Sequence, residues 1–158
     1  MDYEKRIERA VELFNSGFNC SQSVVAAFAD MYGFTEEQAL RMSASFGGGI
    51  GRMRETCGAA CGIFLLAGLE LGMTDPKDSA AKARNYQVVQ ELAAKFKEQN
   101  GSLKCADLLG QLKEKQITHL PEERTAAYYA KRPCPRMVEC AARLWAEKMK
   151  ELHAPVGL

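Results

Sequence analysis

The spacing of apolar residues is the feature that most restricts the fold of this chain. Apolar side chains recur every three or four residues nearly everywhere, as at Ile7, Ala10 and Phe14, and no stretch alternates with period two for long enough to build a sheet. This spacing places the apolar residues on one face of a helix, which can then pack against other helices. The sequence therefore predicts an all-α fold, a bundle of about six to eight helices.

Capping residues, glycines and prolines divide the chain into these helices. The first helix is expected to end near Gly17, and the second to run from Cys20 to Gly33 with Val24, Val25, Phe28 and Met31 on its face. The third is opened by a capping box at Thr35 and carries Leu40 and Met42, and the fourth runs from about Thr56 to Gly72. After these we expect a long helix from a Thr74-Asp75-Pro76 start to Asn100 with Val89, Leu92, Ala93 and Phe96, a short turn from Ser102 through Leu109, a short helix after Pro121, and a last helix carrying Met137, Val138, Ala141, Leu144 and Trp145. Residues 110–118 are polar and are expected to form an exposed loop.

The helix expected from Thr56 to Gly72 has almost no polar face before Glu70. We therefore expect a buried, glycine-rich helix at the centre of the fold, in which Gly58 and Gly62 let another helix approach closely. Its apolar stretch is too short to span a bilayer. A chain of 158 residues is long enough for one apolar core, so residues 1–158 are expected to form a single domain.

The charge balance gives no electrostatic reason to expect a nucleic acid or an anionic membrane as partner. The chain has 21 basic and 20 acidic residues, and its first residues lack the apolar core of a signal peptide. We therefore expect a cytoplasmic protein. Six cysteines in a reducing compartment favour catalytic, redox or metal-binding roles over structural disulfides, although a free cysteine is often only a small buried apolar residue.

Four of the six cysteines fall in the first turns of four different predicted helices: Cys20, Cys57, Cys105 and Cys134. A helix start presents unpaired N–H groups and the positive end of the helix dipole, which lower the pKa of a thiol. Such thiols form the thiolate that reacts with disulfides and binds metals. We expect Cys57 to be the most reactive, because a helix start, arginines and glycines surround it.

The remaining cysteines, Cys61 and Cys140, lie one turn deeper on apolar faces, where core packing and a functional role are both open. No C-x-x-C pair is present, which excludes a zinc ribbon or a thioredoxin-type dithiol, and the absence of C-x-x-C-H excludes covalent haem attachment by that motif. Cys57 and Cys61, four residues apart on one helical face, suit a shared ligand or transient pairing better than a relaxed disulfide.

The sequence from 47 to 62, GGGIGRMRETCGAACG, is nearly free of large side chains. It lacks the third glycine of a dinucleotide fingerprint, since position 54 is Arg54, and no Gly-Lys-Ser/Thr follows, so we expect no nucleotide. We interpret Gly49, Gly51 and Gly58 as letting backbone N–H groups close around sulfur, with Arg52 and Arg54 adding positive charge. A flexible interhelical loop with solvated arginines is the alternative.

These residues resemble a family named for the pattern C, GCAxxG, C, C, whose members carry a CGAxxG motif and four characteristic cysteines and are described as redox-active. The motif matches residues 57–62, CGAACG, and further matching stretches are GFNCSQ at 17–22, FGGGIGRM at 46–53, NGS at 100–102 with Cys105, and CP at 134–135. The resemblance implies that Cys20, Cys57, Cys105 and Cys134 are the family's four cysteines. The family is also similar to the non-haem domain of split-Soret cytochromes, which implies a helical fold and the prospect of an iron–sulfur cluster in a dimer.

Three functions follow as alternatives. The leading hypothesis is a redox protein whose four cysteines cycle between thiolate and disulfide and exchange electrons with an unidentified partner. The second uses the same four cysteines, with Cys61 as a further candidate, as ligands of an iron–sulfur cluster or zinc. The third is a helical interaction protein whose cysteines only fill the core. His119 and His153 are expected on the surface and Trp145 in the core.

Overall fold

The computed structural model describes residues 1–110 and 116–157, and within these residues it is built of helices without a strand. The α-helices are α1 (Tyr3–Asn15), α2 (Cys20–Ala26), α3 (Glu36–Ser43), α4 (Gly58–Leu71), α5 (Ser79–Asn100), α6 (Cys105–Leu109), α7 (Ala126–Lys131) and α8 (Cys134–Leu152). Two short 3₁₀ helices, η1 (Ala29–Tyr32) and η2 (Ala44–Phe46), flank α3. The predicted all-α bundle is confirmed.

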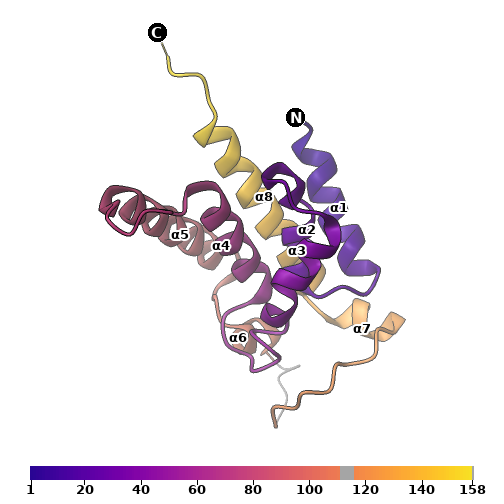
Figure 1. Ribbon diagram of the computed structural model, residues 1–158. Coiled ribbons are helices and arrows are strands. Elements are labelled where there is room, and N and C mark those ends of the chain that lie inside the picture. The colour runs from indigo at the N-terminus through magenta and orange to yellow at the C-terminus, as the bar shows by residue number, and fades with distance from the viewer. Residues whose placement is uncertain (111–115, 158) are drawn as a thin grey trace.

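The helix α4 occupies the centre of the bundle, as its composition predicts. It packs against α2, α5 and α8, while α1 covers the other sides of α2 and α8. All the residues from Gly58 to Ile63 are buried. Figure 1 shows α5 extending to one side of the bundle, α6 and α7 together at its lower end, and both chain termini at the opposite end.

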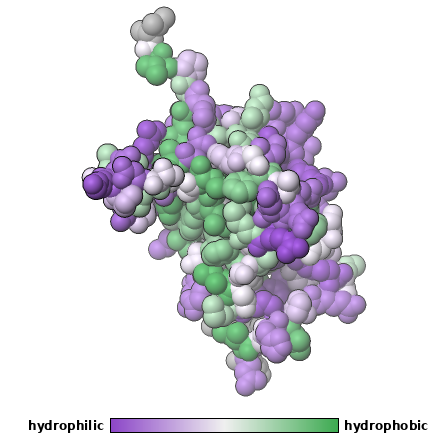
Figure 2. Space-filling view, in the orientation of Figure 1, coloured by the Kyte–Doolittle hydropathy of each residue, from purple (hydrophilic) through white to green (hydrophobic). Residues whose placement is uncertain are grey.

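The core is formed by helices from the whole chain. Its largest buried side chains include Phe14 from α1, Phe28 after α2, Phe96 from α5 and Trp145 from α8. The predicted core position of Trp145 is confirmed. In Figure 2 hydrophilic residues cover much of the outer surface and hydrophobic residues gather in the middle of the view. Among the described residues, no helix has both the length and the apolar character needed to cross a membrane.

Two predicted helix boundaries are wrong. The helix expected from Cys20 to Gly33 breaks after Ala26, because the backbone turns at Phe28 to bury that ring and continues as η1. The long helix begins at Ser79 and not at Pro76, because the side chain of Asp78 accepts the Ala81 N–H and caps the helix. The Asp75 side chain instead accepts the Lys77 N–H within the preceding turn.

The predicted face of α3 is wrong, whereas the predicted face of α5 is confirmed at Leu92 and Phe96. In α3 the buried residues are Ala39 and Ser43, while Leu40 and Met42 are only partly buried. In α5 the buried stripe runs through Val88, Leu92 and Phe96, with the predicted Val89 at its edge. Of the loop expected at 110–118, residues 111–115 lie outside the described residues, and residues 116–118 are exposed.

Candidate functional site

Local capping signals place four cysteines at the start of four helices. A reciprocal capping box between Asn19 and Gln22 fixes Cys20 as the first residue of α2. Cys57 is the N-cap residue of α4, and Cys105 is the first residue of α6. Cys134 is the first residue of α8 and not its N-cap as expected, because Pro133 takes the cap position. The predicted placement at helix starts is thus observed for all four.

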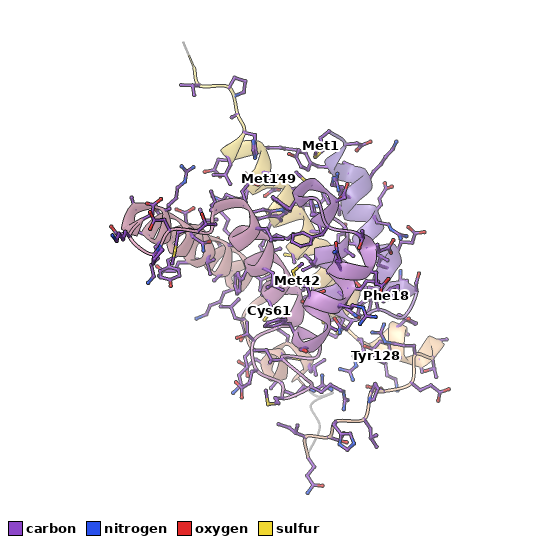
Figure 3. The ribbon with its side chains drawn as sticks, in the orientation of Figure 1. Met1, Phe18, Met42, Cys61, Tyr128 and Met149 are labelled. Atoms are coloured by element: carbon purple, nitrogen blue, oxygen red, sulfur yellow. The ribbon has the colours of Figure 1, made fainter. Side chains whose placement is uncertain are left out.

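The fold brings these four cysteines to one cavity of about 280 Å³, which is near the lower end of about 300–1,000 Å³ for ligand pockets. Cys20, Cys57 and Cys105 are only 9%, 6% and 8% exposed. Tyr128 also lines this cavity, and Figure 3 shows it near the end of the bundle where α6 and α7 lie. Segments that are far apart in the sequence therefore share one small space.

Cys61 and Cys140 are not brought to this cavity. Cys61 lies one turn further along α4, where its thiol is 3.8 Å from the Thr56 carbonyl oxygen. Cys140 lies on α8, and its sulfur contacts the last residues of α5: it is 3.3 Å from the side-chain amide nitrogen of Asn100 and 3.1 Å from the side-chain oxygen of Gln99.

The glycine-rich segment, residues 47–56, contains a run of left-handed backbone. Gly48, Gly49, Ile50, Gly51 and Arg52 all have φ between 56° and 71°. Such φ is uncommon outside glycine and is an outlier for a β-branched residue such as Ile50, so the surrounding structure must impose it. Backbone hydrogen bonds do so, because the Gly51 N–H donates to the Ser45 oxygen at 2.7 Å and the Glu55 N–H donates to the Gly49 oxygen at 2.9 Å.

The end of this segment pairs with the residues before α6. The N–H of Cys105 donates to the Glu55 oxygen at 2.6 Å, and the N–H of Cys57 donates to the Leu103 oxygen at 2.7 Å. Thr56 and Lys104 form an antiparallel bridge between these bonds. The pairing therefore holds Cys57 and Cys105 on neighbouring backbone segments.

The glycines make room for the cysteine side chains. A Cβ atom on Gly58 would lie 2.9 Å from the Cys20 sulfur, and one on Gly49 would lie 2.5 Å from the Cys105 Cβ. Gly51 lines the cavity, although a Cβ there would meet only the Ser45 oxygen at 3.9 Å. Gly47, which the sequence interpretation did not name, accommodates Asn19, since its Cβ would lie 2.2 Å from the Asn19 side chain.

Arginine side chains reach the thiols from the glycine-rich segment. Arg54 is only 6% exposed, and its guanidinium Nη1 lies 3.8 Å from the Cys105 sulfur. This burial rules out the alternative of two solvated arginines. Arg52 lines the cavity and donates from Nη1 to the Thr118 oxygen at 2.7 Å.

Two more arginines, which the sequence interpretation missed, line the same cavity from the α7 region. Arg124 donates to the carbonyl oxygens of Phe14 and Phe18, each at 3.0 Å, and Arg132 forms an ion pair with Glu122. The only sequence signal for Arg132 is its position two residues before Cys134. His119, expected as a surface residue, is exposed but also lines the cavity. His153 lies on the surface as expected, with its ring Nε2 2.8 Å from Oε1 of Glu70.

Burial dominates the ionisation of Cys57, Cys105 and Cys134. It raises the pKa of Cys57 well above its ordinary value, with further repulsion from Cys20, and raises the pKa of Cys134 to about 12. Burial also raises the pKa of Cys105, while the hydrogen bond from Arg54 opposes the increase. The expectation that helix starts lower these pKa values is therefore wrong for Cys57, Cys105 and Cys134, because desolvation of the thiolate outweighs the backbone N–H groups.

The positions of the acidic and sulfur side chains do not provide a site for a single metal ion. Among residues 1–110 and 116–157, no three Cys, His, Asp or Glu side chains are arranged to hold one. The described arrangement is thus one of free thiols around a cavity. The fold and this cavity together define an all-α protein with a buried four-cysteine centre.

Comparison with known sequences identifies the family of the chain. A family model described as "Putative redox-active protein (C_GCAxxG_C_C)" matches residues 18–148, which include all four cysteines of the cavity. The chain belongs to this family, as the sequence resemblance indicated. It is also 33% identical over 112 residues to an uncharacterized protein of Archaeoglobus fulgidus, covering 66% of this chain and 74% of that protein. No solved structure matches the chain.

Proposed function

We propose that the protein is a thiol–disulfide redox protein in which the four cysteines of the cavity exchange electrons with a disulfide-containing partner. The observation that carries the proposal is that Cys20, Cys57, Cys105 and Cys134 line one cavity. Thiols that reach a common space can form and exchange disulfides, whereas thiols that only fill a core are distributed among apolar contacts.

The contacts favour Cys105 as the attacking thiol, and not Cys57 as the sequence suggested. Arg54 lies against the Cys105 sulfur, and Arg132 also lies close enough to favour its thiolate. For Cys57, in contrast, the nearby sulfurs of Cys20 and Cys105 disfavour the thiolate. Arg132 and Arg124 also favour the Cys134 thiolate, but burial raises the pKa of that thiol to about 12. Cys105 is therefore favoured because its sulfur is in direct contact with a guanidinium group.

The second thiol of the reaction is proposed to be Cys20. It lines the same cavity as the other three, and its charge disfavours the thiolates of Cys57, Cys105 and Cys134, so its sulfur is near all of them. In the proposed step the Cys105 thiolate attacks the partner disulfide, and one partner sulfur leaves as a thiolate. Cys20 then attacks the Cys105 sulfur and releases the second partner sulfur, leaving a Cys20–Cys105 disulfide.

Counting thiols before and after mild oxidation tests this proposal. We expect the reduced protein to lose two or four thiols on treatment with a small disulfide, with the bonds mapped by peptide mass spectrometry to the four cavity cysteines. A Cys140→Ser variant serves as the control, because Cys140 lies outside the cavity and its replacement leaves the same loss. If all six thiols survive, the cysteines serve only packing and the proposal fails.

An iron–sulfur cluster is the second candidate, and the set of donor atoms favours it. Four cysteines are the usual ligands of such clusters, and the arginines around the cavity would offset cluster and thiolate charge. Cys20, Cys57, Cys105 and Cys134 would hold the cluster, which supplies one-electron transfer when bound. The described residues do not fit a single zinc ion.

Colour and metal content separate the two candidates. Protein purified without oxygen would absorb broadly near about 400 nm and contain stoichiometric iron if a cluster is bound. Colourless protein without iron, whose thiols oxidise in pairs, would leave the thiol–disulfide proposal standing. A Cys61→Ser variant measured in parallel decides whether Cys61 is a further ligand.

A further inference from the structure

The lining of the cavity is rich in arginine. Four arginines line it together with His119, whereas Glu122 is the one carboxylate in its lining among the described residues. The arginines are Arg52, Arg54, Arg124 and Arg132. In a chain whose 21 basic and 20 acidic residues nearly cancel, this concentration of arginines is local to the cavity.

Two of the arginines, Arg124 and Arg132, lie against the same aromatic ring. The guanidinium carbons of Arg124 and Arg132 lie 4.8 Å and 5.0 Å from the centre of the same Tyr128 ring. The hydrogen bonds of Arg124 in the described part of the chain go to neutral groups, namely the Phe14 and Phe18 oxygens and the Tyr129 hydroxyl. Among the described residues Glu122 forms an ion pair with Arg132 and not with Arg124, so an anion in the cavity would supply Arg124 with a charged partner.

The burial of the thiols limits the size of what can reach them. Cys20, Cys57 and Cys105 are less than a tenth exposed, and the cavity measures about 280 Å³. A disulfide within a folded protein cannot approach these three sulfurs unless the bundle opens, so the partner in the proposed function is expected to be a small molecule. A small molecule can enter the cavity as it stands.

We propose that the cavity binds a small inorganic anion with a reducible sulfur–sulfur bond, of the thiosulfate class, as the substrate of the thiols. This inference rests on the proposed thiol–disulfide function and adds the class of its substrate. The arginines bind the oxygen atoms of the sulfonate end, because a guanidinium donates paired hydrogen bonds to such oxyanions. The sulfur at the other end then meets the thiols.

The proposed reaction is balanced without a further reactant. The Cys105 thiolate attacks the outer sulfur of thiosulfate, so that the sulfur–sulfur bond breaks, sulfite leaves with the electron pair, and a persulfide remains on Cys105. Cys20 gives up its proton and attacks the Cys105 sulfur of this persulfide, and hydrosulfide leaves. Two thiols are oxidised to one disulfide, and one thiosulfate is reduced to sulfite and hydrosulfide.

Single-turnover measurements on the full-length, reduced protein test the inference. With thiosulfate and without oxygen or added reductant, we expect one hydrosulfide and one sulfite released for every two thiols lost. Sulfate, which has the charge and oxygen atoms but no sulfur–sulfur bond, is expected to slow this reaction competitively. It is also expected to raise the melting temperature of the protein.

Charge variants locate the anion. Arg132→Gln is expected to weaken sulfate binding about tenfold, since a hydrogen bond to a charged group is lost. Arg41→Gln is the matched control, because Arg41 is exposed on α3 and paired with Glu37 away from the cavity. If Arg132→Gln fails to fold, competition by sulfate against thiosulfate in the unaltered protein still decides the question.

A neutral disulfide, 2-hydroxyethyl disulfide, separates failure of this inference from failure of the proposed function. If it oxidises the cavity thiols while thiosulfate does not react and sulfate does not compete, the thiol–disulfide function stands and the anion inference is overturned. If neither compound oxidises any thiol, the proposed function itself fails. Equal weakening of sulfate binding by Arg41→Gln would also overturn the cavity as the binding site.

Discussion

Replacing Arg54 should selectively slow the reaction of Cys105 with electrophiles. The guanidinium lies 3.8 Å from the sulfur, and at an effective dielectric constant of about 20 its attraction for the thiolate is about 4 kcal/mol. Complete loss of this attraction would lower the thiolate population about a thousandfold, since about 1.4 kcal/mol corresponds to a factor of ten. A more basic thiolate is a better nucleophile, and a Brønsted coefficient of about 0.4–0.5 restores nearly half of this loss on a logarithmic scale.

In the Arg54→Gln variant we therefore expect Cys105 to react about 5- to 40-fold more slowly, the lower figure applying if water replaces part of the lost attraction. The assay is alkylation of the reduced protein by iodoacetamide at neutral pH, with each cysteine followed by peptide mass spectrometry. Arg52→Gln removes the same charge from the same segment but leaves the Cys105 contact in place, so it should change the rate at Cys105 by less than threefold. A rate in Arg54→Gln within twofold of the unaltered protein, with the fold intact by circular dichroism, would refute the assignment of Cys105 as the activated thiol.

Three further predictions concern stability. Gly58→Ala should cost about 1–3 kcal/mol in urea unfolding, because the new Cβ would lie 2.8 Å from the Phe46 oxygen, whereas Gly68→Ala on the same helix meets nothing within 4 Å and should stabilise by about 0.5–1 kcal/mol. Burial raises the pKa of Cys61 to about 11 and the pKa of Cys134 to about 12, from an ordinary 9.0. Because the folded protein then holds these protons more tightly than the unfolded chain does, the melting temperature of the reduced protein should fall as the pH rises above about 9. The Cys134→Ser variant should show a smaller fall in melting temperature over the same pH range. Arg124→Met should lower the free energy of unfolding by about 2–4 kcal/mol, because it removes hydrogen bonds to two backbone oxygens. Arg41→Met, which breaks an exposed ion pair, should lower it by less than about 1 kcal/mol. Equal losses in the two variants would contradict a structural role for Arg124.

The sequence was sufficient to predict the helices and the cysteines at their starts, because both depend on local signals. Capping at Asn19 and Thr35 involves residues three positions apart, and apolar spacing needs only one helix. The break at Phe28 was not predictable in this way, because it results from burial of that ring against other helices.

The arginines of α7 were missed for a similar reason. Arg124 binds the oxygens of Phe14 and Phe18, more than a hundred residues earlier in the chain, and no local pattern encodes that contact. The raised pKa values were also beyond the reach of the sequence. A helix start indicates which N–H groups face a thiol, but not how completely the bundle excludes water from it.

The distribution of the four cysteines along the chain has a consequence for folding. Cys20 and Cys134 are more than a hundred residues apart, and they come to the same cavity only when α8 has docked onto α1 and α2. Contacts between such distant segments form late, because closing a long loop costs entropy before any packing is gained. In a partly folded chain the thiols are therefore dispersed, and premature pairing among them is disfavoured. The four-cysteine cavity forms only with the completed tertiary structure, so disulfide formation among these four thiols would report native folding directly.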